Sequence, residues 1–318
     1  MRSGKLPALL CATVVSAHAS GALAADIVIG VPDWPSVRAT AHVLKVALED
    51  RLGLDVELRD GDNPAIFDAM DAGSIHVHPE VWLPNNDHLK KRFVDAKRSV
   101  KMSPHAVAGE QGMCTTKGTV ERTGIANLAD LKDPAMAANF DDDGDGKGEV
   151  WIGASGWSST TIEKIRARSY GYDDTMTLEE SAEADALADV AAAIAADENV
   201  VFFCYSPHHI FETYELVVLD EPPHDPTRWT IVQPSAIPGW LEKSRAGVAW
   251  DTASLHITYA TSLESEQPQA AAMLTNVTLD TDTLSAMTHA LVVERQDPAD
   301  FAAAWVEENA DRVAGWLP

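Results

Sequence analysis

Four aromatic residues lie at the ends of expected strands or in the turns beside them: Trp34, Trp82, Trp157 and Tyr205. Ligands of open α/β sheets bind in the crevice beyond the strand ends, so we expect these rings to converge there. A trimethylammonium group has no N–H to donate, whereas each aromatic face attracts it by about 0.5 to 2 kcal/mol. Together the rings predict an aromatic cage for a quaternary ammonium group, although core packing better explains any one ring taken alone.

A small, hydroxyl-rich turn, Gly156-Trp157-Ser158-Ser159, leads into an expected helix. Free backbone N–H groups at the start of a helix accept a carboxylate. A ligand with a cation at one end and an anion at the other would then be held at both ends. An ordinary Ser or Thr helix cap explains the same residues equally well.

An acidic loop carries carboxylates at alternate positions, Asp141, Asp143 and Asp145, followed by Glu149. The pattern resembles the start of a calcium-binding loop. The match is partial, because Ile152 stands where an EF-hand has its bidentate Glu. The sequence therefore suggests a structural calcium ion, with an acidic turn that binds no metal as the alternative.

Histidines occur in two pairs that could indicate zinc, His76 with His78 near Glu80, and His208 with His209. Alternate residues on a strand point to one face, so the first pair could share a metal, but a third ligand is not evident. No Ser-His-Asp or Cys-His grouping has a nucleophile-like context. The histidine pairs thus leave one alternative from another class of function, an exported metal-dependent hydrolase.

The elements that must position these residues alternate between strand and helix, which predicts an α/β protein with parallel sheets covered by helices. Pro35 opens a helix that Gly53 closes, between two apolar strands. The expected strands are 26–31, 56–58, 76–78, 200–203 and 255–259, and the expected helices are 35–53, 64–70, 160–170, 182–196, 283–293 and 298–310.

Composition limits the class of protein. Residues 1–24 have basic residues, a short apolar run and small residues in the order of a cleaved secretory signal peptide. About 290 residues then remain, which predicts two lobes. Removing that segment leaves 22 basic and 49 acidic residues, a net charge of −27, which makes nucleic acid a poor partner. Cys114 and Cys204 could pair or stay free.

The chain resembles the substrate-binding proteins of glycine betaine and proline betaine ABC transporters. The resemblance covers nearly all of the chain after the signal peptide. The stretches that carry it are Trp82-Leu83-Pro84, Ile125 through Phe140, Asp143 through Lys147, Gly156-Trp157, Val201-Phe202-Phe203 and Tyr205-Ser206-Pro207.

This resemblance implies a two-lobed type II periplasmic binding protein fold whose lobes are joined by two crossover hinge segments. Residues 25–110 and 250–318 would form lobe 1, and residues 111–249 would form lobe 2. The protein would be a periplasmic monomer, not an enzyme, that closes on its ligand with no required cofactor. It would deliver a betaine to a permease and an ATPase at the inner membrane.

The resemblance also assigns site residues. Trp82 and Trp157 fall on cage tryptophans of the family, and Tyr205 falls where enterobacterial relatives carry a third tryptophan. The backbone of Ser158 and Ser159 falls where the family binds the ligand carboxylate. These assignments make the predicted ligand a glycine betaine or proline betaine type of osmolyte.

The chain departs from the family at several of these positions. Asn86 stands where some members have a histidine that touches the ligand carboxylate, and Trp34 offers a fourth ring face that not every member has. Asp33 and Glu80 lie beside cage candidates and could favour a ligand without a carboxylate, although solvent-facing acids explain them as well. Trimethylamine N-oxide, choline and carnitine are therefore alternative ligands, and a sensor domain without transport is a third function.

Overall fold

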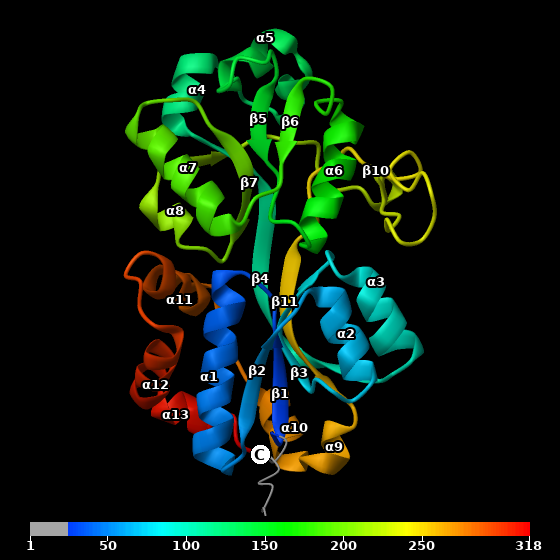
Figure 1. Cartoon of the computed structure of the whole chain (residues 1–318), viewed down its shortest axis with the longest axis vertical. Coiled ribbons are helices and arrows are strands. Elements are labelled where there is room, and N and C mark those ends of the chain that lie inside the picture. The colour runs from blue at the N-terminus through cyan, green and yellow to red at the C-terminus, as the bar shows by residue number, and fades with distance from the viewer. Residues whose placement is uncertain (1–24) are drawn as a thin grey trace, which may run out of the picture.

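The computed structural model describes residues 25–318, so the predicted signal peptide lies outside the described residues. Two lobes are built on one continuous set of strands, with the order β2-β1-β3-β11-β4-β7-β5-β6 and with β8 beside β4. Figure 1 shows one lobe made of the blue and cyan N-terminal elements with the orange and red C-terminal ones. The green elements form the other lobe, which confirms the two-lobed α/β prediction.

Lobe 1 contains a mixed sheet. In it β1 runs parallel to β2 and β3, and β11 runs antiparallel to β3 and β4. All but the last residue of β3 are buried, so this central strand has helices on both faces. The strands are β1 (Ile27–Val31), β2 (Val56–Asp60), β3 (Val77–Leu83), β11 (Ala253–Ala260) and the first part of β4 (Val100–Thr116). The main helices are α1 (Pro35–Leu52), α2 (Asn63–Asp71), α10 (Pro268–Asn276), α11 (Thr281–Val292) and α12 (Pro298–Glu308).

Lobe 2 repeats the alternation around a smaller sheet, in which β5 runs parallel to β6 and β7. Its strands are β5 (Gly148–Trp151), β6 (Met176–Glu179), β7 (Val201–Ser206), β8 (Leu216–Val218) and the second part of β4. The helices of lobe 2 are α4 (Lys117–Thr123), α5 (Pro134–Ala137), α6 (Ser158–Tyr170), α7 (Glu183–Ala195) and α8 (Ile210–Thr213). Shorter elements are α3 (Asp87–Leu89), α9 (Leu263–Glu266), α13 (Ala310–Ala314), β9 (Trp229–Thr230) and β10 (Arg245–Ala246).

Local sequence accounts for the ends of the main helices. Helix α1 begins with Pro35 at its first position and ends at Gly53, which takes the left-handed conformation that glycine adopts without strain. Helix α6 ends in the same way at Gly171. The helices and strands expected from the sequence are all present, with ends that differ by a few residues.

The longest strand, β4, was not predicted. It spans 17 residues, but buried and exposed positions do not alternate regularly along it, and Pro104, Gly109 and Gly112 interrupt it. Up to Gly109 it pairs with β11, and from Glu110 to Thr115 it pairs with β7. The strand therefore passes from one lobe to the other, and the segment 247–252 returns the chain to β11. We keep the lobe limits 25–110, 250–318 and 111–249 as a proposal, which this change of partner supports.

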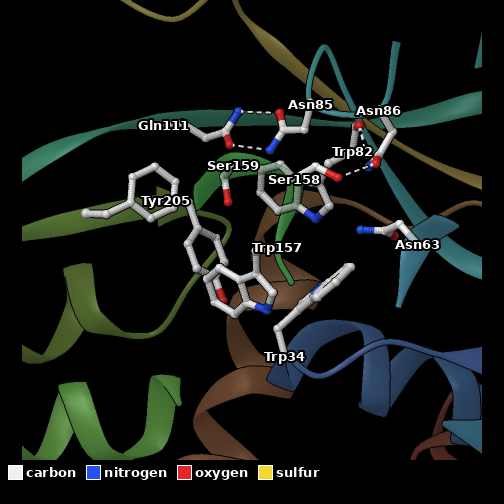
Figure 2. Close-up of a pocket in the computed structure, with 11 residues that line it drawn as sticks. Trp34, Asn63, Trp82, Asn85, Asn86, Gln111, Trp157, Ser158, Ser159 and Tyr205 are labelled. Atoms are coloured by element: carbon white, nitrogen blue, oxygen red, sulfur yellow. Dashed lines mark hydrogen bonds between the residues drawn. The ribbon is translucent and has the colours of Figure 1, made fainter. Parts of the chain in front are cut away.

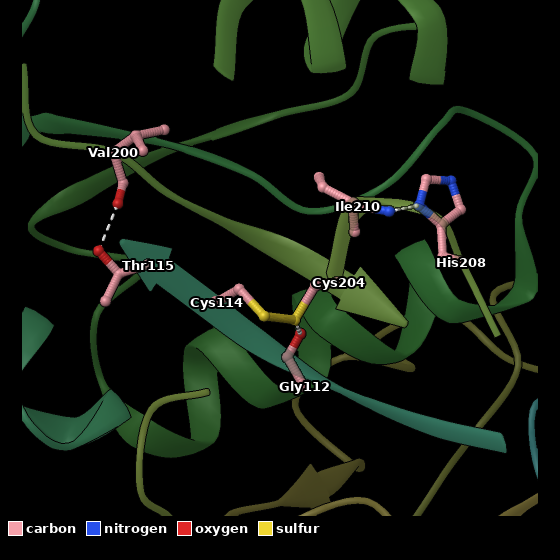
Figure 3. Close-up of a disulfide and its surroundings, with 7 residues drawn as sticks. All are labelled: Gly112, Cys114, Thr115, Val200, Cys204, His208 and Ile210. Carbon is pink, nitrogen blue, oxygen red and sulfur yellow. Dashed lines mark hydrogen bonds between the residues drawn. A yellow bond between two sulfur atoms is a disulfide. The ribbon is translucent and has the colours of Figure 1, made fainter. Parts of the chain in front are cut away.

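A disulfide joins Cys114 on β4 to Cys204 on β7, 90 residues apart in the sequence (Figure 3). The two strands are antiparallel neighbours, with Gly112 opposite Cys204. The bridge therefore fastens the second part of the crossing strand to the strand that carries Tyr205. Sequence alone left the state of these cysteines open.

Candidate functional site

A pocket between the lobes contains all seven ligand-binding residues predicted from the sequence. Figure 2 shows the rings and the polar side chains facing one another across it. Its lining consists of Trp34, Asn63, Trp82, Asn85, Asn86, Gln111, Trp157, Ser158, Ser159, Phe203 and Tyr205. The structure brings the seven together, and their role in binding a ligand stays a prediction.

The four predicted rings stand roughly perpendicular to their neighbours and form the walls of a box. Ring centroids are 6.1 Å apart for Trp34 and Trp157, 5.9 Å for Trp157 and Tyr205, and 5.4 Å for Tyr205 and Trp82. The corresponding interplanar angles are 83°, 79° and 86°. Edge-to-face packing of this kind presents several π faces to one small volume.

The lobe 1 side of the box is held by one buried carboxylate. Glu80 Oε1 accepts hydrogen bonds from Trp34 Nε1 at 2.7 Å, from Ser36 Oγ at 2.7 Å and from Trp82 Nε1 at 2.9 Å. Trp34 is the residue that precedes α1, and Trp82 lies near the end of β3. A single carboxylate oxygen therefore fixes the planes of two rings that come from different elements.

The structure decides between the two readings of the acids beside the cage. The Asp33 side chain is 84% exposed and pairs with Arg38, as a surface acid does. Glu80 is only 2% exposed, so a solvent-facing role is wrong for this residue. Burial raises the pKa of Glu80, although the bonds from Trp34 and Trp82 act in the opposite direction.

The lobe 2 side of the box has its own carboxylate. The Tyr205 hydroxyl donates to Glu183 Oε1 at 2.7 Å, and burial next to Glu183 raises the pKa of Tyr205 well above its usual value. The hydroxyl therefore stays protonated and points away from the box. Trp157 reaches across the lobes, because its Nε1 donates to the backbone oxygen of Asp33 at 3.1 Å.

Polar side chains close the opposite side of the pocket by pairing across the lobes (Figure 2). The Asn85 and Gln111 amides donate to each other at 2.7 and 3.0 Å. Ser158 Oγ donates to Asn86 Oδ1 at 2.7 Å. These pairs join the turn after β3 to β4 and α6, so they connect lobe 1 with lobe 2.

Four lining residues were missed by sequence reasoning: Asn63, Asn85, Gln111 and Phe203. Asn85 directly follows a stretch that carries the family resemblance, which could have found it. Gln111 had no signal of its own, because it lies on β4, the strand that the sequence did not predict. No Lys, Arg, His, Asp or Glu is among the lining residues.

The start of α6 is not an ordinary side-chain cap. The capping position is occupied by Trp157, whose side chain accepts no hydrogen bond from the helix, and the Ser158 hydroxyl donates to Asn86. Ser158 and Ser159, the first two residues of this 13-residue helix, line the pocket, and backbone N–H groups at this end have no partner within the helix. Such groups favour a negatively charged or strongly polar ligand atom.

The histidine pairs do not form a metal site in the part of the chain that the structure describes. His78 is fully buried and its Nε2 lies 2.8 Å from Asn63 Oδ1, while its Nδ1 accepts from the Glu80 backbone N–H at 3.2 Å. His76 Nδ1 instead accepts from the backbone N–H of Val28. His208 and His209 lie in lobe 2. His76 and His78 therefore hold backbone and side-chain groups of lobe 1 in place.

The acidic loop does gather its four carboxylates. One oxygen from each of Asp141, Asp143, Asp145 and Glu149 lies within 4.8 Å of the others. Asp141 also accepts from the backbone N–H groups of Gly144 and Gly146, which curls the loop around it. This donor set suits a hard cation such as Ca²⁺, and metal binding here remains our prediction.

The fold and the pocket together define a class of protein: two-lobed α/β proteins with an aromatic-lined pocket between the lobes. The chain belongs to the family described as the substrate binding domain of the ABC-type glycine betaine transport system, whose model matches residues 25–308. Proteins of this family are solute-binding components of transporters rather than enzymes. Among residues 25–318, no helix has both the length and the apolar character needed to cross a membrane.

Individual relatives are distant. The chain is 24% identical over 245 residues to the glycine betaine-binding periplasmic protein OusX of Dickeya dadantii, which covers 74% of this chain and 72% of the relative. It is 25% identical over 329 residues to the trimethylamine N-oxide-binding protein of Pelagibacter ubique. This match covers 99% of this chain and 98% of the relative. A choline-binding protein of an ABC transporter, solved in complex with choline, matches with a TM-score of 0.72 at 18% identity, which covers 91% of this chain and 90% of that one.

Proposed function

We propose that this protein binds a small quaternary ammonium osmolyte, of the glycine betaine or proline betaine type, in the box of Trp34, Trp82, Trp157 and Tyr205. The observation that carries the proposal is the meeting of these four rings at one pocket between the lobes. Three or four ring faces together with buried methyl surface approach the roughly 8 kcal/mol of micromolar binding.

The polar side of the pocket supports a ligand with a second, anionic group. In this proposal the backbone N–H groups of Ser158 and Ser159 receive that group, and Asn86 holds the Ser158 hydroxyl beside it. The lobes close on the ligand because Trp157 and Ser158 of lobe 2 bond to residues of lobe 1.

A second set of ligands is favoured by a specific observation. The pocket lining has no cationic side chain that could pair with a carboxylate, and a buried acid stands behind two of the rings. Choline, trimethylamine N-oxide and carnitine are therefore the alternatives. The match to a trimethylamine N-oxide-binding relative over nearly the whole chain supports testing them together.

We further propose that the protein acts as a monomer in the periplasm and delivers its ligand to a permease driven by an ATPase. Periplasmic relatives and the predicted signal peptide support this location. The net charge of the whole chain is −25, which does not favour nucleic acid as a partner.

The test is calorimetric titration of the protein without residues 1–24 against glycine betaine, proline betaine, choline, carnitine and trimethylamine N-oxide. We expect saturable binding of at least one of them, and at least a hundredfold loss of affinity in Trp157→Ala. Trp240→Ala is the matched control, since Trp240 is absent from the pocket lining and should bind like the wild type. Folded protein that binds none of the five would reject the proposal.

A further inference from the structure

Glu80 lies behind the box and not in its lining, so it does not belong to the set of residues that touch the pocket. Its Oε1 is shared by three donors, two of which are the indole N–H groups of Trp34 and Trp82. Among the described residues its Oε2 and the Thr40 hydroxyl are buried without a hydrogen-bond partner, and both residues line a second small pocket. The side-chain hydrogen bonds of this carboxylate therefore go to two of the four rings and to Ser36.

Among the described residues no cation pairs with Glu80, whose three side-chain hydrogen-bond donors are all neutral. The charge of Glu183, another acid, raises the pKa of Glu80 further. Glu183 in turn accepts from the Tyr205 hydroxyl, so carboxylates lie behind three of the four rings. An anion that accepts the N–H edge of an indole leaves the ring face more negative, because it pushes electron density toward the π system.

We propose that Glu80 is a positioning and specificity-determining residue, which orients Trp34 and Trp82 and biases the cage toward ligands whose positive charge is not offset by a carboxylate of their own. The inference rests on the proposed function and deepens it. A quaternary cation such as tetramethylammonium gains the full attraction of the buried charge. A zwitterion gains less, because its own carboxylate is repelled by the same charge.

Two variants separate the charge of Glu80 from its geometry. Glu80→Gln keeps an oxygen acceptor for the two indoles and for Ser36 but removes the charge. Glu80→Asp keeps the charge but shortens the reach to the rings by one carbon. Asp68→Asn is the matched control, because it removes an exposed acid of the same lobe that is absent from the pocket lining. Near-UV circular dichroism of each variant reports whether the tryptophans keep their environment.

The measured quantity is the ratio of the dissociation constants for tetramethylammonium and glycine betaine. In Glu80→Gln we expect tetramethylammonium to lose roughly tenfold more affinity than glycine betaine loses. In Glu80→Asp we expect the ratio to stay within about twofold of wild type while both affinities fall by roughly tenfold. Asp68→Asn should change neither affinity by more than about twofold, since exposed charges are screened.

The possible failures can be told apart. Wild-type protein that is folded and binds no member of the ligand panel would reject the proposed function and this inference with it. Wild-type binding with an unchanged ratio in Glu80→Gln would reject the inference alone. If Glu80→Gln does not fold, Glu80→Asp still decides, because wild-type affinity in that variant would overturn the positioning role.

Discussion

Buried carboxylates are held differently in the two lobes. In lobe 2 the fully buried Arg166 lies between two acids, with its Nε 2.9 Å from Glu163 Oε1 and its Nη2 2.5 Å from Glu221 Oε2. In lobe 1 Glu80 is just as buried but meets only neutral donors. A protein that needs a buried acid for its fold usually supplies a cation beside it. The absence of one at Glu80 leaves the charge available to a ligand.

The lobe 2 cluster also fastens the second crossing segment. Arg166 Nη1 donates to the backbone oxygen of Val248, and Trp250 Nε1 donates to Glu163 Oε1 at 2.7 Å. Burial raises the pKa of Glu163 to about 6, although Arg166 lowers it. This cluster therefore stabilises the place where the chain leaves lobe 2, while the Glu80 cluster arranges rings at the pocket. We therefore expect that removing the cation Arg166 strongly lowers the stability of the fold, whereas removing the charge of Glu80 leaves the stability unchanged or raises it.

The largest expected effect is the loss of Arg166. Arg166→Met should lower the free energy of unfolding by about 3 to 5 kcal/mol, because it leaves Glu163 and Glu221 buried without a cation. Urea denaturation followed by tryptophan fluorescence measures this change. Arg168→Met is the control on the same helix, since Arg168 is 46% exposed and should change stability by less than about 0.5 kcal/mol. If the two variants changed the free energy of unfolding equally, the buried acids of lobe 2 would not depend on Arg166 for charge compensation.

A smaller effect is expected from His78, which lies two residues from Glu80 on β3. Burial lowers the pKa of His78 to about 3, so the native state holds it neutral while the unfolded chain protonates it near its ordinary value of 6.5. The stabilising contribution is complete above about pH 6.5 and is lost as the pH falls toward 3. At pH 5 the loss is about 2 kcal/mol.

The measurement for His78 is urea denaturation at pH 7.5 and pH 5 in the wild type and in His78→Gln. The difference in unfolding free energy between the two pH values should shrink by about 2 kcal/mol in the variant. His289→Gln changes a histidine whose side chain is 39% exposed and serves as the control. A pH dependence that survives unchanged in His78→Gln would show that this histidine is not held neutral.

Glu80→Gln should have a small effect of opposite sign on the free protein. Because burial raises the pKa of Glu80, the native state loses stability as the pH rises from the ordinary value of 4.5 toward the raised pKa. We therefore expect the variant at pH 7.5 to be as stable as the wild type or more stable by about 1 kcal/mol, and the difference to vanish in acid. If Glu80→Gln lowered the free energy of unfolding of the ligand-free protein by several kcal/mol, Glu80 would be needed for the fold, as the Arg166 cluster is.

The smallest expected effect concerns the exposed acids of the loop, a third group of carboxylates. If Asp141, Asp143, Asp145 and Glu149 bind Ca²⁺, 1 mM Ca²⁺ should raise the free energy of unfolding by about 1 kcal/mol over EDTA. The gain should disappear in the double variant Asp143→Asn, Asp145→Asn, and Mg²⁺ should not reproduce it. Identical melting in Ca²⁺ and EDTA would leave the loop as an acidic turn.

Most of the fold could be predicted from the sequence, because the residue pattern of each short segment indicates whether it forms a strand or a helix. Apolar runs such as Val201 to Phe203 and the glycine stop at Gly53 depend on neighbours a few residues away. The strand β4 could not be predicted in this way. Its first part pairs with β11 and its second part with β7, so polar and apolar residues do not alternate in one regular pattern along the whole strand.

The candidate site was predictable in part for the same reason. The four rings stand in stretches whose residue types and neighbours mark strand ends and turns, and a family resemblance covers three of them. No local sequence signal identifies Gln111 and Asn63. They line the pocket because the fold brings together segments that are distant in the chain. Figure 2 shows them beside residues from both lobes.

The sequence by itself determined the alternation of strands and helices, the aromatic residues of the cage and the family to which they point, since each depends on residue type and local spacing. Only the tertiary structure decided which of the two acids beside the cage is buried, that Cys114 and Cys204 pair, and that His76 and His78 bond to different groups of lobe 1. The physical reason is that burial, pairing and charge compensation are properties of contacts between distant segments. Glu80 is an acid like any other in the sequence, and it becomes the counter-charge of a cage only where β3 packs against the start of α1.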